Sequence, residues 1–399
     1  MSHVLITHMG KPISADKEYP RTTYVLDQTA FETSMLSFGL AKQLQPDSMV
    51  FIGTSGSAWS SLISMHEGLQ HEDDLQLTLE GIESDDNMVN ADLKPLQTCL
   101  AAQLNCTVYC RVVPYLETSP VKESAHYLKT LAEVIKAGDD ITLDITHGLR
   151  YHPMLALVAA QYLKVTLHAN IKSILYGNYE RKTAEGHSLV MHLNGMLEIM
   201  DWVGALNSFD KDGDYSIFSE LMHKDGVDPS LCSEVEKAGF FERTTNSVNA
   251  KQHLTTLKES TIEFETTPLT SLFSGALSER TEWAKTSGRG NNEFQLAELY
   301  LERGDYLRAA IFAQEGYISK QLHRKKDDLN DFDIRKDFNK NCKVPEFIDL
   351  REIRNSMAHG LPGKQNMTQE RQQKLEKALK SQIELEKALK GYIKALKQN

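Results

Sequence analysis

The sequence predicts an N-terminal α/β domain built on a parallel sheet, followed by all-α structure. In the first half of the 399-residue chain, short β-rich runs alternate with helical patterns, an order typical of a parallel sheet with helices on both faces. In the second half, apolar residues recur at helical spacing. We therefore expect a sheet domain over residues 1–195, a helical linker region over 196–290 and a helical bundle over 291–399.

The β-rich runs of the first half lie at five places: residues 4–8, 49–52, 107–113, 141–145 and 171–177. Helical patterns cover four further segments: 29–44, 93–104, 121–137 and 154–163. Residues 66–96 are acidic and weakly patterned, which indicates an insertion or a variable segment. Helices between the strands provide the crossovers that parallel pairing requires.

The composition indicates in which compartment the protein works and which kinds of binding partner it can have. The apolar fraction of 41% and the charged fraction of 25% are typical of soluble globular proteins. Neither a membrane-spanning run nor a signal peptide is visible, so we expect a cytoplasmic protein without a membrane partner. Five cysteines form no paired framework or zinc spacing, so we expect reduced thiols and no metal. A net charge of −11 argues against a DNA partner but allows a local anion site.

Three polar loops follow strands of the predicted sheet: Met9-Gly10-Lys11, Thr54-Ser55-Gly56 and Thr146–Arg150. Ligands of parallel sheets collect at the carboxyl ends of the strands. Hydroxyls, glycines that let a backbone approach closely, helix N-termini and an arginine suit phosphates and ribose hydroxyls. Tight βα turns explain the glycines and threonines of any single loop equally well. Neither a dinucleotide fingerprint nor a Walker motif occurs, which argues against a dehydrogenase or an NTPase.

The predicted bundle contains helical patterns over 294–301, 306–322, 347–359 and 369–397. Near the end of the third, Asn355 and His359 are four residues apart and share a helix face, with Arg354 beside them. This set offers a cation for a phosphate, an amide, and an imidazole that can move a proton near neutral pH. The structural alternative is that Arg354 pairs with Glu352 or Asp349 and that His359 caps the helix.

The run Asp144-Ile-Thr-His-Gly-Leu-Arg150 resembles the CARF (CRISPR-associated Rossmann fold) domain of type III CRISPR accessory ribonucleases. The segments His152-Pro-Met-Leu155 and Leu175-Tyr-Gly-Asn-Tyr-Glu180 fit the same pattern, as do Val4–Gly10 and the loop Thr54–Trp59. The resemblance covers about residues 1–220 and returns at 294–360. Two positions depart from the family: Leu149 stands where Phe is usual, and Lys11 replaces a small or hydroxylated residue.

This resemblance implies a Rossmann-like CARF domain in a homodimer, or a higher homo-oligomer, that binds a cyclic oligoadenylate across its two-fold axis. Cyclic tetra-adenylate is the first expectation for the ring and hexa-adenylate the second. Asp144 is expected to support its own loop, because its charge would repel a phosphate. The candidate ligand-binding residues by position are Gly10, Lys11, Thr54, Ser55, Gly56, Thr146, His147, Gly148 and Arg150.

A helical bundle with Arg354-Asn355-x3-His359 near a helix end resembles the HEPN ribonuclease domain, in the position expected after a CARF domain. The resemblance implies metal-independent cleavage of single-stranded RNA in antiviral defence, without a cofactor other than the cyclic activator. His359 would move a proton, Arg354 would stabilise phosphoryl charge, and Asn355 would orient a phosphoryl oxygen. One arginine and one histidine make an incomplete site, so two protomers are expected to combine theirs.

Two other functions are compatible with these motifs. In the first, the chain is a non-catalytic sensor that recruits a partner through its helical bundle. In the second, the CARF site slowly cuts its own ligand, using backbone contacts and Thr54, Thr146 or His147. The combination of CARF-like loops with the bundle motif favours the ligand-activated endoribonuclease over both.

Overall fold

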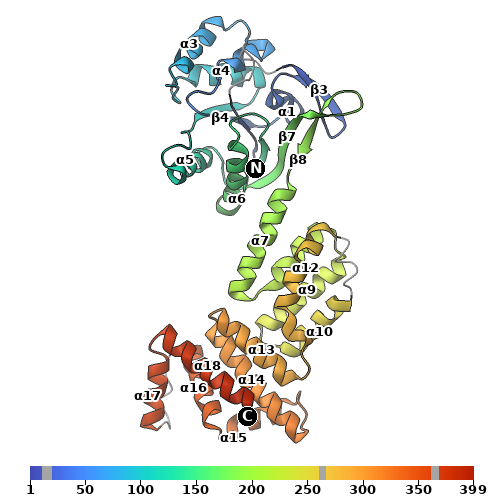
Figure 1. Ribbon diagram of the computed structural model, residues 1–399, viewed down its shortest axis with the longest axis vertical. Helices are drawn as coiled ribbons and strands as arrows, with labels where there is room; N and C mark the ends of the chain where they lie inside the picture. The colour runs from blue at the N-terminus through green and yellow to red at the C-terminus, as the bar shows by residue number, and fades with distance from the viewer. Residues whose placement is uncertain (11–19, 260–266, 361–367) are drawn as a thin grey trace. The chain divides into compact units, whose positions relative to one another are not determined.

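The computed structural model describes residues 1–10, 20–259, 267–360 and 368–399. The chain divides into two compact units, Met1–Glu198 and Ile199–Asn399. Figure 1 shows a sheet covered by helices in the first unit and only helices in the second. The predicted fold class, a mostly parallel sheet domain followed by all-helical structure, is confirmed. Within the described residues, no helix is both long enough and apolar enough to cross a membrane.

The first unit contains an eight-stranded sheet with the order β3-β2-β8-β7-β6-β1-β4-β5. The strands are β1 (His3–His8), β2 (Thr22–Leu26), β3 (Thr29–Thr33), β4 (Ser48–Gly53), β5 (Thr107–Val112), β6 (Asp140–Asp144), β7 (Asn170–Lys182) and β8 (Ser188–His192). Its helices are α1 (Leu36–Leu44), α2 (Ser61–Ser64), η1 (Glu67–Leu69), α3 (Asp73–Ser84), α4 (Lys94–Leu104), α5 (Pro120–Ala132) and α6 (His152–Thr166). Five strands, from β5 to β7 in the sheet order, pair in parallel, and β7–β8 and β2–β3 are antiparallel hairpins.

The central strand β1 determines where the polar loops lie. It pairs with β4 on one side and with β6 on the other, so Thr7 stands beside both Phe51 and Asp144. Leu5 and Ile6 are fully buried, as expected for a strand with both faces covered. Because the three strands are parallel and adjacent, their carboxyl ends meet at one edge of the sheet. The loops that follow them are therefore neighbours.

The helix expected over 29–44 is wrong in its first part. Residues Thr29–Thr33 form β3, which pairs with β2, and only Leu36–Leu44 is helical. Asp27 and Gln28 both have positive φ, 46° and 71°, which suits the two-residue turn of a hairpin. The apolar residues at helical spacing thus belonged to a strand and a helix in succession.

The second unit is built only of helices in its described part, and the first of them, α7, begins within the first unit. They are α7 (Gly195–Asp212), η2 (Tyr215–Ile217), α8 (Phe218–Lys224), α9 (Pro229–Arg243), α10 (Ser247–Glu259), α12 (Pro268–Arg280), η3 (Glu282–Lys285), α13 (Arg289–Glu302), α14 (Tyr306–Lys325), α15 (Phe332–Asn341), α16 (Pro345–His359), α17 (Gln369–Ala378) and α18 (Gln382–Gln398). The single helix expected over 369–397 is wrong, because Ser381 begins a new helix by accepting a hydrogen bond from Glu384 N–H.

The second unit has one continuous hydrophobic core. Its buried side chains run from Trp202 on α7 to Leu396 on α18, and Phe312 on α14 is among them. Helices α13 and α14 approach closely where a Cβ on Gly290 would lie 2.9 Å from the carbonyl oxygen of Gly316. Side chains from both sides of residue 291 share this core. The boundary predicted there, between a linker region and a helical bundle, stays a prediction.

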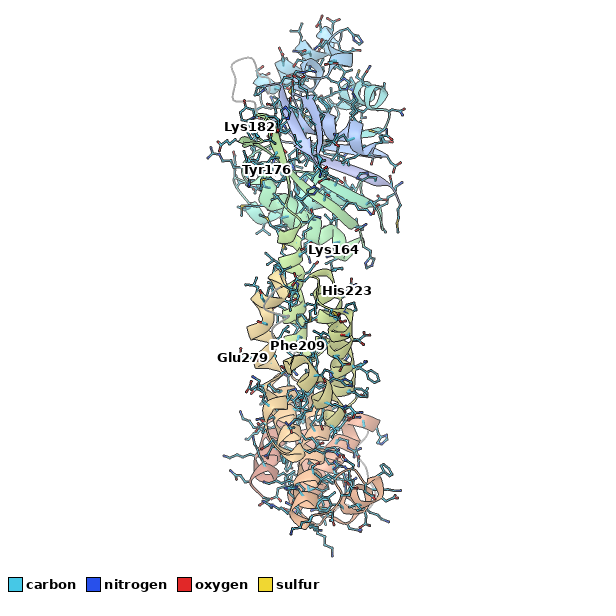
Figure 2. The ribbon with its side chains drawn as sticks, turned by 90° about the vertical axis from the view of Figure 1, so that its right-hand side faces the viewer. Lys164, Tyr176, Lys182, Phe209, His223 and Glu279 are labelled. Carbon is cyan, nitrogen blue, oxygen red and sulfur yellow. The ribbon has the colours of Figure 1, made fainter. Side chains whose placement is uncertain are left out.

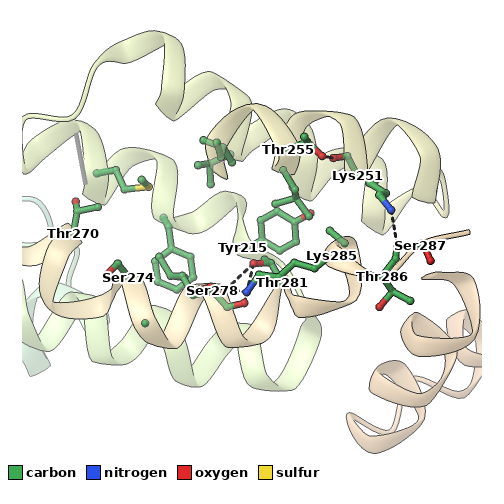
Figure 3. Close-up of a pocket in the computed structure, with 18 residues that line it drawn as sticks. Tyr215, Lys251, Thr255, Thr270, Ser274, Ser278, Thr281, Lys285, Thr286 and Ser287 are labelled. Atoms are coloured by element: carbon green, nitrogen blue, oxygen red, sulfur yellow. Dashed lines mark hydrogen bonds between the residues drawn. The ribbon is translucent and has the colours of Figure 1, made fainter. Parts of the chain in front are cut away.

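A cavity of about 590 Å³ lies among α8, α9, α10 and α12 (Figure 3). Phe218, Met222 and Leu254 provide apolar wall, while α12 contributes small hydroxylated side chains. Two lysines in its lining are already bonded: Lys251 donates to the carbonyl oxygen of Thr286 (2.6 Å) and Lys285 to Ser278 Oγ (3.2 Å). The cavity is therefore mainly apolar, and its ammonium groups have internal partners.

One carboxyl group is enclosed in the same core. Glu242 on α9 is 1% exposed and accepts a hydrogen bond from Tyr300 Oη (2.9 Å). Burial raises the pKa of Glu242 from 4.5 to about 7. Burial also raises the pKa of the neighbouring Tyr215 and Tyr300 hydroxyls, so both remain neutral. The folded protein therefore holds a proton on Glu242 at a pH where the unfolded chain has lost it.

This difference predicts a pH-dependent stability. Between pH 4.5 and 7 the native state binds more protons at this site than the unfolded state, so the free energy of unfolding should fall as pH rises through that window. Glu242→Gln cannot ionise and keeps an acceptor for Tyr300, so this decline should become smaller. Urea unfolding at both ends of the window measures it, with the exposed Glu236→Gln on the same helix as control. Equal pH slopes in wild type and Glu242→Gln would contradict the assignment.

Candidate functional site

The loops after β1, β4 and β6 are joined by backbone contacts. Met9 N–H donates to Ile52 O (2.6 Å), and Ala58 N–H donates to Gly10 O (3.1 Å). A Cβ on Gly10 would lie 2.9 Å from the Cα of Gly148, so the first and third loops touch backbone to backbone. The structure thus brings the predicted Gly10 and Gly148 together. The predicted Lys11 lies outside the described residues.

The loop Thr54-Ser55-Gly56 is held from two sides. Thr54 is buried, and its N–H donates to Ser57 Oγ (2.9 Å). Ser55 Oγ donates to the carboxylate of Asp86 (2.6 Å), and Gly56 N–H donates to Tyr115 Oη (3.2 Å). Of the three predicted residues, only Ser55 is partly exposed. Thr54 and Gly56 therefore shape the loop.

The loop from Asp144 to Arg150 is organised by its first residue. Asp144 is fully buried and accepts hydrogen bonds from Thr7 Oγ1 and from the N–H of Thr146 (3.0 Å each). Thr146 Oγ1 in turn accepts from Gly177 N–H on β7 (2.8 Å). Gly148 has φ +106°, a conformation that favours glycine. The arrangement agrees with a supporting role for Asp144 and leaves Thr146 bonded within the protein.

The other two predicted residues of this loop differ in exposure. His147 Nε2 accepts a hydrogen bond from Leu36 N–H at the start of α1 (3.4 Å), and removal of its ring from water lowers its pKa. His147 is therefore neutral near pH 7. Arg150 is exposed and makes no hydrogen bond or ion pair with the described residues. Its guanidinium is available to an anionic ligand at this edge.

Three buried rings lie beneath the loop and were not predicted as part of the site. His8 Nε2 bonds to Tyr127 Oη (2.7 Å), and the ring of His152 lies 5.1 Å from that of His8. His152 Nδ1 accepts from Leu149 N–H (3.2 Å), which shapes the turn at Gly148. Burial, and then the neighbouring His8, lower the pKa of His152 to about 3, so it stays a neutral acceptor.

Strand β7 contributes two tyrosines near the point where it contacts the same loop. Tyr176 directly precedes Gly177, whose N–H donates to Thr146 Oγ1, and Tyr179 follows two residues after that glycine. Both tyrosines are exposed, and the Lys182 ammonium lies 4.0 Å from the Tyr179 ring centroid. Figure 2 labels Tyr176 and Lys182 on this strand. Exposed aromatic rings of this kind can stack on nucleobases.

Comparison with known proteins agrees with this geometry. Residues 4–180 match the family model of the CARF domain of the CRISPR system endoribonuclease Csx1. The N-terminal unit is a CARF domain. All three loops lie within the matched residues, and the prediction of a CARF domain is confirmed.

A curated protein is similar over a longer stretch. CRISPR-associated protein MJ1674 of Methanocaldococcus jannaschii is 22% identical in an alignment of 247 residues that covers 58% of this chain. The alignment spans 39% of the length of that protein. Together the two matches support a CRISPR-related protein with a CARF domain in its N-terminal half.

The second candidate site lies at the end of α16 in the helical unit. Pro345 begins this helix, and Gly360, with φ +71°, ends it directly after His359. Phe347, Leu350 and Ile353 are buried on one side of the helix. Asn355 is half-buried and His359 is exposed, and neither side chain has a hydrogen-bond partner among the described residues.

The ion pairs that offered a structural alternative for Arg354 do not form among the described residues. Asp349 pairs with Arg371 (3.3 Å) and Lys374 (2.6 Å), and Glu352 lies 3.7 Å from Arg351. Arg354 instead donates its Nε–H to Gln314 Oε1 (3.2 Å). Its positive charge is therefore not neutralised by a carboxylate in the described part of the chain.

Sequence reasoning missed several residues that shape the two sites. Asp86 and Tyr115 hold the second loop, the buried His8 and His152 support the third, and Gln314 contacts Arg354. His8 and His152 stand in segments that fit the family pattern but were not predicted as site residues. Asp86, Tyr115 and Gln314 stand in no such segment and act on residues distant in the sequence. A signal was available for His8, which ends the first strand directly after a run of buried residues.

The contact between Gly10 and Gly148 predicts the effect of an added methyl group. Gly10→Ala would place Cβ against backbone atoms that cannot turn away, so it should destabilise the CARF domain by about 1–3 kcal/mol. Thermal unfolding monitored by circular dichroism measures the loss. The matched control is Gly81→Ala, where nothing lies within 4 Å of the new Cβ and α3 should be slightly stabilised. Equal stability of the two variants would contradict the close approach.

Proposed function

We propose that this protein is an endoribonuclease of type III CRISPR defence that cleaves single-stranded RNA when a cyclic oligoadenylate binds its CARF domain. The proposal rests mainly on one observation: a chain with a CARF domain also presents Arg354, Asn355 and His359 at one helix end, with the arginine unpaired by any acid among the described residues. Cyclic tetra-adenylate is the activator we expect first.

The proposed reaction needs no metal. A base removes the proton of an RNA 2′-hydroxyl, whose oxygen attacks the adjacent phosphorus. The bond from phosphorus to the 5′-oxygen breaks, that oxygen is protonated, and the other product carries a cyclic 2′,3′-phosphate. His359 acts as base or acid, Arg354 stabilises charge on the phosphoryl oxygens, and Asn355 orients one of them. Two protomers supply the two histidines that a separate base and acid require.

The CARF edge suits a ring of nucleotides. Gly10 and Gly148 let the first and third loops meet backbone to backbone at this edge. Ser55 offers a hydroxyl there, and Arg150 offers a phosphate a cation that has no partner among the described residues. The exposed Tyr176 directly precedes the residue of β7 that is bonded to the loop, and its ring can meet an adenine. A local site of this kind is compatible with a net charge of −11 for the whole chain.

An apolar stripe on α6 supports a two-fold symmetric dimer. Met154, Val158, Tyr162 and Val165 recur at helical spacing along α6, and all four are exposed, Met154 by 72% and Val165 by 63%. A stripe of this kind without cover in one chain is typical of an interface. Since α6 follows the loop that ends at Arg150, a second copy packed on it would bring two ligand loops together.

Replacing the proposed proton-transfer group tests the function directly. His359→Ala should lower cyclic-oligoadenylate-stimulated RNA cleavage at least about 100-fold, because a general acid or base contributes a factor of that order. Binding of the ring to the CARF domain should be unchanged. Cleavage of a labelled single-stranded RNA, with a panel of cyclic oligoadenylates as activators, measures both the activity and the ring size.

The outcomes of that assay separate the alternatives. Wild-type activity in His359→Ala would overturn the assignment of the site. A wild-type protein that binds the ring and never cuts RNA would favour a sensor that recruits a partner. Linear ligand products formed by His359→Ala would reveal cleavage of the ring at the CARF site.

The α6 stripe gives an independent prediction about assembly. Val158→Lys places a charge in the middle of the stripe and should weaken the dimer at least about 10-fold, with a matching loss of RNA cleavage at low protein concentration. Val121→Lys on α5 is the matched control, because Val121 is 83% exposed and lies off the stripe. Sedimentation velocity measures the dissociation constants. An unchanged dimer in Val158→Lys would exclude this face as the interface.

A further inference from the structure

Gln314 is a buried polar residue whose side-chain amide forms a hydrogen bond through its oxygen and another through its nitrogen. Its side chain lies on α14 and is 2% exposed. Gln314 Oε1 accepts the Nε–H of Arg354 on α16 (3.2 Å), and Gln314 Nε2 donates to Asn339 Oδ1 on α15 (2.9 Å). A buried amide is costly unless it is bonded, so its two contacts define its conformation. One side chain thus connects three helices at the candidate ribonuclease site.

The chemistry of the partners determines which way the amide points. A guanidinium can only donate, so the carbonyl oxygen of Gln314 must face Arg354. The amino group of Gln314 then faces Asn339 and needs an acceptor there, which the Asn339 side-chain oxygen supplies. The backbone of Asn339 is held in place, because its oxygen accepts from Arg351 Nη1 (2.6 Å). The order of donors and acceptors leaves a single orientation for Gln314.

This contact also determines which part of Arg354 remains available. The bond to Gln314 occupies Nε, which leaves the two terminal nitrogens and their four N–H groups. That pair of nitrogens forms the edge with which arginine binds phosphate in a bidentate way. Because the guanidinium is planar, fixing the direction of Nε–H restricts the direction of that edge.

We propose that Gln314, oriented by Asn339, is a positioning residue that directs the free edge of the Arg354 guanidinium toward the phosphate of the bound RNA. The proposal rests on the ribonuclease function proposed above. Because Asn339 lies on α15, the packing of α15 against α14 becomes part of what positions Arg354. Helix α15 has no fully buried side chain. It contacts α14 through Phe338, whose ring packs on Tyr317, and through polar groups, among them Arg335 with Glu315 and with Ser319 Oγ (3.1 Å).

Replacing Gln314 by side chains of similar size distinguishes a role in orienting Arg354 from a role in packing. Gln314→Met fills the same space without either hydrogen bond, and should lower the cleavage rate at saturating RNA about 10- to 100-fold, the cost of a misplaced catalytic group. Gln314→Glu keeps the acceptor for Arg354, and the Asn339 amide can rotate to donate to it. That variant should remain within about 3-fold of wild type. The matched control is Gln321→Met on the same helix, which contacts neither Arg354 nor Asn339.

A second measurement does not depend on activity. In full-length protein labelled with ¹⁵N-arginine, the Nε–H signal of Arg354, assigned by its absence in Arg354→Lys, should exchange slowly with water. The exchange should become at least about 10-fold faster in Gln314→Met and remain slow in Gln321→Met.

Results that reject the role of Gln314 can be distinguished from results that reject the ribonuclease function. Wild-type cleavage by Gln314→Met, or a loss in Gln314→Glu equal to that in Gln314→Met, would show that Gln314 does not act through Arg354. Unchanged exchange in Gln314→Met would show that the hydrogen bond is absent. Failure of the wild-type protein to cut RNA with any ring would reject the ribonuclease function, while the exchange measurement would still test the contact.

Discussion

The backbone contact between Gly10 and Gly148 is the constraint on which the CARF edge depends. It exists because β1 pairs with both β4 and β6, which sets their carboxyl ends side by side. The buried Asp144 then holds the third loop through Thr7 and Thr146. Exposed groups such as Arg150 thus belong to loops in which Thr54, Asp144 and Thr146 are already bonded within the protein. A ligand at this edge therefore meets a shape that exists before it binds.

The sequence predicted the elements whose pattern is local. Buried strands such as β1 and β4 appear as short apolar runs, and α16 has an apolar side and a glycine stop. The strand β3 was missed because its residues continue the helical spacing of α1 when only side-chain polarity is considered, and without it β2 had no hairpin partner. The break before α18 was missed because one serine cap interrupts a long amphipathic pattern. In both cases turn and cap chemistry prevailed over periodicity.

In the candidate sites too, the sequence predicted the residues of local motifs but not their distant partners. Arg354 and Arg150 stand in recognisable motifs, but the partners that position them do not. Gln314 lies 40 residues from Arg354 in sequence, and Tyr127 lies 119 residues from His8. Such contacts arise from the packing of helices and strands, and no spacing rule in one sequence encodes them. The motif supplies the chemical groups, and tertiary contacts determine how those side chains are oriented.

The central claim is that ligand binding at the CARF domain activates RNA cleavage at the helical site. Its most direct test is to titrate wild-type protein with cyclic tetra-adenylate and follow ligand binding and fluorescent-RNA cleavage in parallel. The account predicts almost no cleavage without ligand, and an activation curve that rises with the occupancy of the CARF domain. Cleavage that is equally fast without the ring, or full occupancy by each ring tested without any cleavage, would contradict it.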